Sequence, residues 1–200
     1  RINNVTEAME QMITDGITEV IVQPTHVING IENDLMKEDA LAFKNRFERI
    51  TFGDPLLTTQ QDHVEIVNAI CQEFSNLPAD CALILMGHGT SHYSNDVYAA
   101  LDYRFKDLGF SNIHLATVEG YPTLENVTRM VKEQEAKKVI LAPFMIVAGD
   151  HARNDMSGDD EDSWKNQFRA AGYDVECRMK GLGEYPAIQD MLIRHVTEVC

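Results

Sequence analysis

Apolar and polar positions follow two different periods along the chain, which predicts helices and strands in turn. Apolar residues three or four positions apart indicate amphipathic helices, and short β-branched or apolar runs indicate strands. The expected helices cover residues 5–15, 30–47, 63–74, 95–108, 124–135, 162–171 and 186–200. The expected strands cover residues 18–23, 49–52, 82–86, 113–118, 138–144 and 174–179. Strands that alternate with helices predict an α/β fold with parallel sheets flanked by helices.

Two parts of the sequence resemble each other. Each carries Asn-Val-Thr at a helix, then a strand that ends in Pro, then a Gly. Pro24 and Pro143 are 119 residues apart (143 − 24), and so are Gly30 and Gly149 (149 − 30). A duplicated unit explains this coincidence better than the general similarity of strand–helix units, although that alternative stays open.

The repeat predicts two similar domains, over residues 1–79 and 80–200, with a linker near residues 76–80. The strand at Leu83 has its counterpart before residue 1, because 83 − 119 = −36. We therefore expect that the first domain is truncated at its N-terminal side and that this chain is part of a longer two-domain protein.

The composition of the chain limits the partners and the cellular compartment that we expect for it. The net charge of −15 argues against nucleic acid as a partner. No apolar run approaches the ~18 residues of a membrane span, so no membrane partner is expected. The four cysteines form no CxxC pair and are expected to be reduced thiols, which favours a cytoplasmic protein.

Three ionisable residues follow predicted strands of the second domain. His88 follows the strand at Leu83 and is flanked by Gly87 and Gly89, Glu119 follows the strand at Ile113, and His151 comes after the strand at Lys138. Parallel strands bring their carboxyl ends to one edge of a sheet, so we expect the three side chains to face one crevice. The alternative is that each residue caps its own helix.

Two imidazoles and one carboxylate suit a borderline divalent ion such as Co²⁺, Ni²⁺, Fe²⁺ or Zn²⁺. The same groups accept protons near neutral pH. Neither a dinucleotide fingerprint nor a phosphate-binding loop is present. A hydrolase is disfavoured because the sequence has no nucleophile elbow.

Other polar residues have two interpretations each. The acidic run at 155–162 is typical of a solvated helix start, and alternatively it collects cations near His151. The remaining histidines at 26, 63, 114 and 195 are expected at the surface or packed, with His26 at a strand end that faces the cleft. Phe144 and Met145 form either an apolar wall for a ligand or part of the core.

Five stretches resemble the cobaltochelatases of the anaerobic cobalamin pathway, which are class II, cofactor-free chelatases. They are residues 86–92 (MGHGTSH), 118–122 (VEGYP), 147–156 (VAGDHARNDM), 160–165 (DEDSWK) and 181–188 (GLGEYPAI). The similarity covers essentially the whole chain, and the Ala-Gly-Asp-His stretch is highly specific. The family's opening strand and Gly-Thr-Ser loop are not present in this sequence.

The resemblance implies two similar α/β domains with an active site in the cleft between them. It implies insertion of Co²⁺ into sirohydrochlorin, with cobalt as substrate metal and no organic cofactor. The family's metal-binding and catalytic residues fall on His88, Glu119 and His151. Expected substrate contacts are Gly89, Thr90, Ser91, His92 and Met145. The alternatives are a chelatase for Fe²⁺ or Ni²⁺ and a non-catalytic tetrapyrrole or metal carrier; a homo-oligomer is also left open.

Overall fold

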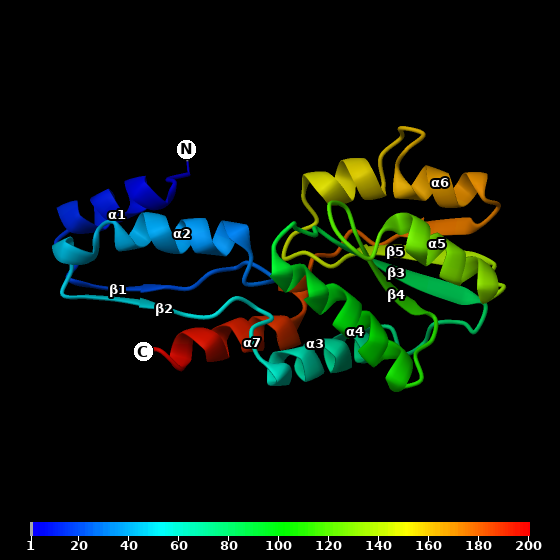
Figure 1. Cartoon of the computed structure of the whole chain (residues 1–200), viewed down its shortest axis with the longest axis horizontal. Helices are drawn as coiled ribbons and strands as arrows, with labels where there is room; N and C mark the ends of the chain where they lie inside the picture. The colour runs from blue at the N-terminus through cyan, green and yellow to red at the C-terminus, as the bar shows by residue number, and fades with distance from the viewer. Residues whose placement is uncertain (1) are drawn as a thin grey trace.

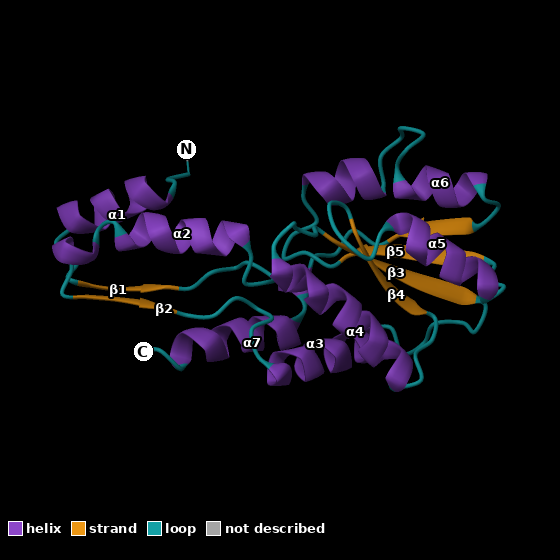
Figure 2. Cartoon of the chain, in the orientation of Figure 1, coloured by secondary structure: helices purple, strands orange, loops and turns teal. Residues whose placement is uncertain are grey.

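The computed structural model describes residues 2–200 and contains two parallel sheets (Figures 1 and 2). The smaller sheet pairs β1 (Glu19–Val22) with β2 (Arg49–Phe52). Helices α1 (Val5–Thr14) and α2 (Ile31–Leu41) cover it, and a short apolar cluster that includes Met9, Val20 and Ala40 fills the contact. The expectation that a further segment precedes residue 1 stays a prediction.

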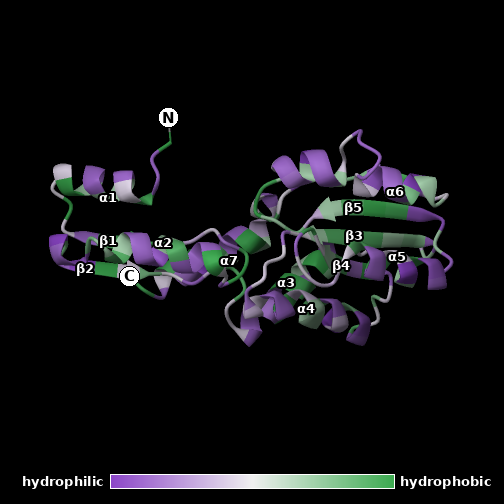
Figure 3. Ribbon diagram, turned by 45° about the horizontal axis from the view of Figure 1, so that its top comes forward, coloured by the Kyte–Doolittle hydropathy of each residue, from purple (hydrophilic) through white to green (hydrophobic). Residues whose placement is uncertain are grey.

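The larger sheet has the strand order β4-β3-β5-β6, all parallel. Its strands are β3 (Cys81–Gly87), β4 (Ile113–Thr117), β5 (Lys138–Pro143) and β6 (Asp174–Cys177). Every residue of β3 is buried, because this central strand has both of its faces covered. Such a strand can be apolar throughout. Figure 3 shows this apolar centre between helices whose outer faces are polar.

Helices cover both faces of the larger sheet. One face packs on α3 (Gln60–Glu73) and α4 (Asp96–Asp107), and the other on α5 (Leu124–Glu133) and α6 (Trp164–Ala170). Along β3 the side chains alternate: Leu83 and Leu85 enter the first core, whereas Ile84 and Met86 enter the second. The predicted α/β class with parallel sheets flanked by helices is confirmed.

Two helices link the part of the molecule around the smaller sheet, here called the first half, to the part around the larger sheet, the second half. Helix α3 follows β2, yet its Ile66 and Ile70 share one apolar core with Leu83 of the larger sheet. Helix α7 (Pro186–Thr197) follows β6 but runs back along the smaller sheet, and its His195 meets the loop after β2 (Figure 1). One core therefore continues across position 79/80, and the division into residues 1–79 and 80–200 stays a prediction about the duplicated units.

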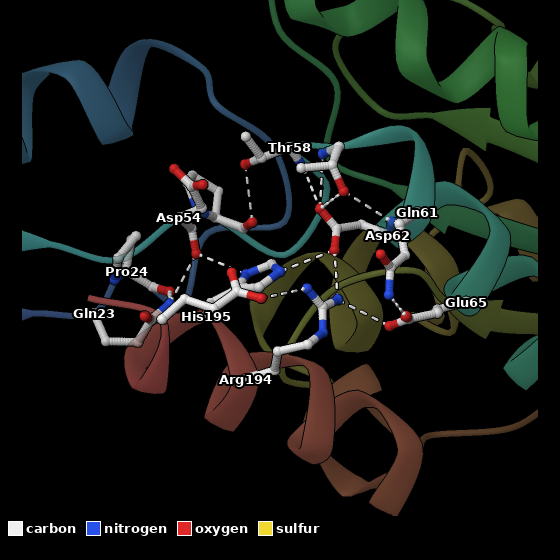
Figure 4. Close-up of polar contacts among 12 residues, drawn as sticks. Gln23, Pro24, Asp54, Thr58, Gln61, Asp62, Glu65, Arg194 and His195 are labelled. Carbon is white, nitrogen blue, oxygen red and sulfur yellow. Dashed lines mark hydrogen bonds and ion pairs between the residues drawn. The ribbon is translucent and has the colours of Figure 1, made fainter. Parts of the chain in front are cut away.

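A buried network of ion pairs and hydrogen bonds joins α3 to α7 (Figure 4). Asp62 of α3 is fully buried and accepts hydrogen bonds from Arg194 Nη2 (2.7 Å) and His195 Nε2 (2.9 Å) of α7. His195 Nδ1 lies 3.1 Å from the carbonyl oxygen of Asp54. Burial alone would raise the pKa of Asp62, but the hydrogen bonds from Arg194, Thr59 and His195 outweigh it and lower that pKa.

Three expectations about the elements need correction. The predicted helix 30–47 ends at Leu41 and is followed by a short 3₁₀ turn (Lys44–Arg46). A π-helix (Ala152–Met156) and a second 3₁₀ turn (Leu182–Glu184) occupy regions where no element was predicted. These pieces are too short to leave a periodic pattern. A further 3₁₀ turn of three residues (Tyr93–Asn95) precedes α4, and the predicted helix 95–108 included only its last residue.

The structure refines the repeat. Helices α1 and α5 begin at Val5 and Leu124, which are 119 residues apart (124 − 5), like the two prolines and the two glycines. The Asn-Val-Thr triplets do not match: Asn4 caps α1, whereas Asn126 is the third residue of α5 and Thr123 is its cap. That part of the alignment was wrong.

Strand β4 lies at an edge of its sheet, and side chains of α4 satisfy its outer backbone groups. Lys106 Nζ donates to the carbonyl oxygen of Ile113 (2.6 Å), and the Leu115 N–H donates to Asp102 Oδ1 (2.8 Å). Lys106 and Asp102 also pair with each other at 2.6 Å. This cover prevents another strand from adding to the edge. Within residues 2–200, no helix has the length and apolar content needed to cross a membrane.

His114 of β4 makes the free energy of unfolding depend on pH. It is fully buried, with Nε2 2.9 Å from Gln134 Oε1 and Nδ1 3.3 Å from Lys106 Nζ. Burial and the Lys106 charge lower the pKa of His114 to about 4. Between that value and the unfolded pKa of ~6.5 the unfolded chain binds more protons, so stability falls as pH falls through this window.

We expect this loss to reach up to about 3 kcal/mol by pH ~4 and to be absent in His114→Gln. Urea unfolding at about pH 7, 5.5 and 4.5 measures it. Equal pH dependence in the two proteins would contradict the assignment.

Candidate metal and tetrapyrrole site

The candidate site lies at the carboxyl edge of the larger sheet. Strands β4, β3 and β5 are neighbours and end together, and the backbone ladder continues past them. The Glu119 N–H donates to the carbonyl oxygen of His88 (2.9 Å), and the Phe144 N–H donates to that of Met86 (2.6 Å). The residues that follow these strands are therefore held at fixed spacing.

His88, Glu119 and His151 meet at this edge. Each offers one ligand atom, and these atoms all lie within 4.8 Å of one another. The two imidazole rings are 4.7 Å apart between centroids and almost perpendicular. Ligands at ~2.0–2.2 Å from an ion lie at most ~4.4 Å apart, so small side-chain movements would close this group around a metal ion. The interpretation as three separate helix caps does not hold, because the side chains converge.

Two glycines fix the turn that carries His88. At Gly87 a Cβ atom would lie 2.6 Å from the Tyr98 ring, and at Gly89, where φ is +84°, it would lie 2.6 Å from Gly120 N. Neither position accepts a side chain without movement of its neighbours. His88 Nδ1 is 2.8 Å from the carbonyl oxygen of Gly89. This contact occupies Nδ1, which also lies 4.0 Å from Glu119 Oε2, and leaves Nε2 as the ring nitrogen available to a metal ion.

A cavity of about 190 Å³ separates the two halves next to His88. The first half contributes His26, Val27, Ile28 and Glu32, and the second contributes His88, Gly89, Thr90, Tyr98, Phe144 and Met145. Glu119 and His151 lie outside its lining. The cavity is smaller than the ~300–1,000 Å³ of most ligand pockets, so a macrocycle would have to extend beyond it.

The expected substrate contacts divide into two groups. Gly89, Thr90 and Met145 line the cavity, whereas Ser91 and His92 do not. His92 Nδ1 accepts from the Ser94 N–H (3.2 Å), and His92 Nε2 lies 3.8 Å from Asp34 on α2. His92 therefore connects the two halves beside the cavity.

Asn95 is a positioning residue that sequence reasoning missed. Its Oδ1 accepts from the Thr90 N–H (3.0 Å), and its Nδ2 donates to the carbonyl oxygen of Tyr121 (2.7 Å). It thus ties the loop after β3 to the loop after β4. Because Asn95 uses the Thr90 N–H, that group is not free to bind a substrate carboxylate.

Glu32 was also missed, although the repeat contained the signal. It lies 119 residues before His151 (151 − 32), at the first turn of α2, and it lines the cavity from the opposite half. Tyr98 lines the cavity from the second half. Burial raises the pKa of Tyr98 to about 12, so its hydroxyl stays protonated. The cavity walls therefore differ: one offers a carboxylate and the other a neutral phenol.

The acidic run behaves mostly as a solvated loop. Residues 159–162 are exposed, Asp159 pairs with Lys165 at 3.1 Å, and Ser163 caps α6. Asp155 differs, because its Oδ2 lies 2.6 Å from His151 Nδ1. Of the histidines expected at the surface or packed, His114 and His195 are buried, His63 is half-buried, and His26 lines the cavity.

Comparison with known proteins gives a consistent result. A family model described as cobalt chelatase (CbiK) matches residues 1–200. Sirohydrochlorin cobaltochelatase of Salmonella typhimurium is 36% identical over 190 residues, which are 95% of this chain and 72% of that protein. Sirohydrochlorin cobaltochelatase CbiKC of Nitratidesulfovibrio vulgaris is 32% identical over 201 residues, or 98% of this chain and 70% of that protein.

Among solved structures, SirB from Bacillus subtilis with Fe³⁺ superposes with a TM-score of 0.67 at 13% identity. The match covers 99% of this chain and 78% of that one. SirB from Bacillus subtilis subspecies spizizenii in complex with cobalt gives a TM-score of 0.64 at 15% identity, covering 99% and 76%. At such identities the likeness shows the fold alone.

Proposed function

The chain belongs to the cobalt chelatase (CbiK) family, and from this membership we propose that it inserts Co²⁺ into sirohydrochlorin. The observation that supports this function most directly is the convergence of His88, Glu119 and His151. Two neutral imidazoles and a carboxylate match the preferences of a borderline divalent ion. Their exposure suits a metal that must arrive and leave: the three side chains are 41%, 58% and 33% exposed.

The reaction exchanges protons for metal. As Co²⁺ enters the macrocycle, two pyrrole N–H protons leave, so charge balances with no change of oxidation state. The residues that release the metal regain free lone pairs and can accept these protons. His88 is best placed for this exchange, since it belongs to the metal cluster and also borders the cavity.

The cavity supports the macrocycle from two sides. Val27 and Ile28 from the first half and Met145 from the second line the cavity and supply apolar surface for the ring faces, whereas Phe144, which also borders the cavity, is fully buried in the core. Gly89, Thr90, Ser91 and His92 stay proposed substrate contacts near its mouth. Arg153 is exposed and close in sequence to His151, and it can offset the repulsion between an acidic protein and the substrate carboxylates.

No organic cofactor is proposed, because the exchange includes neither electron transfer nor phosphoryl transfer. The four cysteines are free thiols, which fits a reducing compartment, and we place the protein in the cytoplasm. The net charge of −15 supports partners other than nucleic acid. A homo-oligomer remains compatible with this site.

A chelatase assay with Co²⁺, Fe²⁺ and Ni²⁺ side by side tests the function. We expect the protein to accelerate Co²⁺ entry over many turnovers, seen as the absorption change of the macrocycle, and to do so faster than for the other two ions. Glu119→Gln should lower this rate while keeping the side-chain shape. Stoichiometric binding of metal or tetrapyrrole without rate acceleration would instead support a non-catalytic carrier.

A further inference from the structure

The two histidines of the cluster have different partners at Nδ1. His88 Nδ1 lies 2.8 Å from a neutral carbonyl oxygen, that of Gly89, whereas His151 Nδ1 lies 2.6 Å from the Asp155 carboxylate. Both acceptors require a proton on Nδ1, so both rings keep Nε2 as a free lone pair for a metal. Glu119 Oε2 also lies 4.0 Å from His88 Nδ1, which is beyond hydrogen-bond distance, so of the two rings it is His151 whose Nδ1 hydrogen-bonds to a carboxylate.

The local fold holds Asp155 in place. His151 and Asp155 are four residues apart on one side of the π-helical turn, and the Ser157 N–H donates to the carbonyl oxygen of Ala152 (3.1 Å). Ala152 and Met156 are fully buried in the second core and anchor the turn. Asp155 therefore meets His151 because of the backbone geometry and not through an adjustable loop.

The geometry points to Asp155 as the positioning residue of His151, an inference that rests on the proposed function. A carboxylate behind a metal-binding imidazole fixes ring orientation and strengthens the imidazole as a ligand. His151 is then the tighter metal ligand of the pair. His88, held by a neutral carbonyl, is the ligand that releases the metal more readily toward the cavity.

The matched control comes from the same acidic stretch. Asp160 is exposed, and its hydrogen bonds within the described residues run through its backbone carbonyl, to Asn166 and Ser163. Asp160→Ala therefore removes one negative charge from the acidic run and leaves His151 and its partner intact. It separates the specific contact from the general field of the acidic run.

The experiment measures the dissociation constant of Co²⁺ by calorimetry on the full chain without tetrapyrrole, together with kcat and the KM for Co²⁺. We expect Asp155→Ala to weaken Co²⁺ binding about 10–100-fold and to raise this KM with a smaller change in kcat. Asp155→Asn keeps an acceptor for Nδ1 and should lose less. Asp160→Ala should stay within about twofold of the wild type, since screening weakens exposed charges.

Each outcome decides between explanations. Unchanged Co²⁺ binding in a folded Asp155→Ala protein would overturn the inference while leaving the chelatase function intact. Equal losses in Asp155→Ala and Asp160→Ala would also overturn it, in favour of a general acidic field. If the wild type itself neither binds nor inserts Co²⁺, the proposed function fails first. Should Asp155→Ala not fold, Asp155→Asn carries the same comparison.

Discussion

His88→Ala is expected to lower kcat for Co²⁺ insertion by about 10²–10⁴-fold, and saturating Co²⁺ should not restore the rate. The glycine-flanked turn holds His88 in one geometry between the metal cluster and the cavity. We therefore assign it the transfer of pyrrole protons in addition to metal binding. Mass action can refill a metal site, but it cannot supply a missing base.

His151→Ala is the matched comparison. This variant should raise the KM for Co²⁺ and regain most of its rate at high Co²⁺ concentration, because its main loss is affinity. Initial rates over a wide range of Co²⁺ concentrations, at saturating tetrapyrrole, separate the two behaviours. Full rescue of His88→Ala by added cobalt would rule out the proton-accepting role.

Asp62→Ala should lower the free energy of unfolding by about 3–5 kcal/mol at neutral pH, as expected when one partner of a buried ion pair is removed. The variant leaves the buried His195 without its carboxylate, removes one of the carboxylate partners of Arg194, and removes the Asp62 side chain from the capping box that it forms with Thr59, the N-cap of α3. Urea unfolding followed by circular dichroism measures the loss.

Two controls make this prediction specific. Glu65→Ala removes another partner of Arg194, at 2.9 Å but 34% exposed, and should cost only ~0–1 kcal/mol. The folded-state pKa of Asp62 is lowered, so its contribution is complete above the unfolded pKa of ~3.9 and is lost as pH falls toward the lowered value. A penalty for Asp62→Ala that stays constant under acidic conditions would contradict this account.

The convergence of the site could be predicted because it depends on local patterns. A fully apolar run marks β3 as a central strand, and parallel neighbours must end at one edge, which brings His88, Glu119 and His151 together. The contact between Asp62 and His195 could not be predicted, since it joins residues 133 positions apart and has no periodic signal.

Two other features fall between these cases. The His151–Asp155 contact depends on a π-helical turn, and such short pieces leave no period to read in a sequence. Glu32 was within reach, because the offset of 119 residues places it at the counterpart of His151.

The exchange of α3 and α7 between the halves constrains how the protein is made on the ribosome. Asp54 and His195 of α7 are in contact although they are 141 residues apart in the chain. The first half therefore cannot pack against α7 until the whole second half has been synthesised. The cleft then forms only once both halves have emerged. If the chain were cut between residues 79 and 80, α7 would be separated from the smaller sheet along which it runs, and α3 would be separated from the core that it fills. Neither fragment would then contain all the elements that form one side of the cleft.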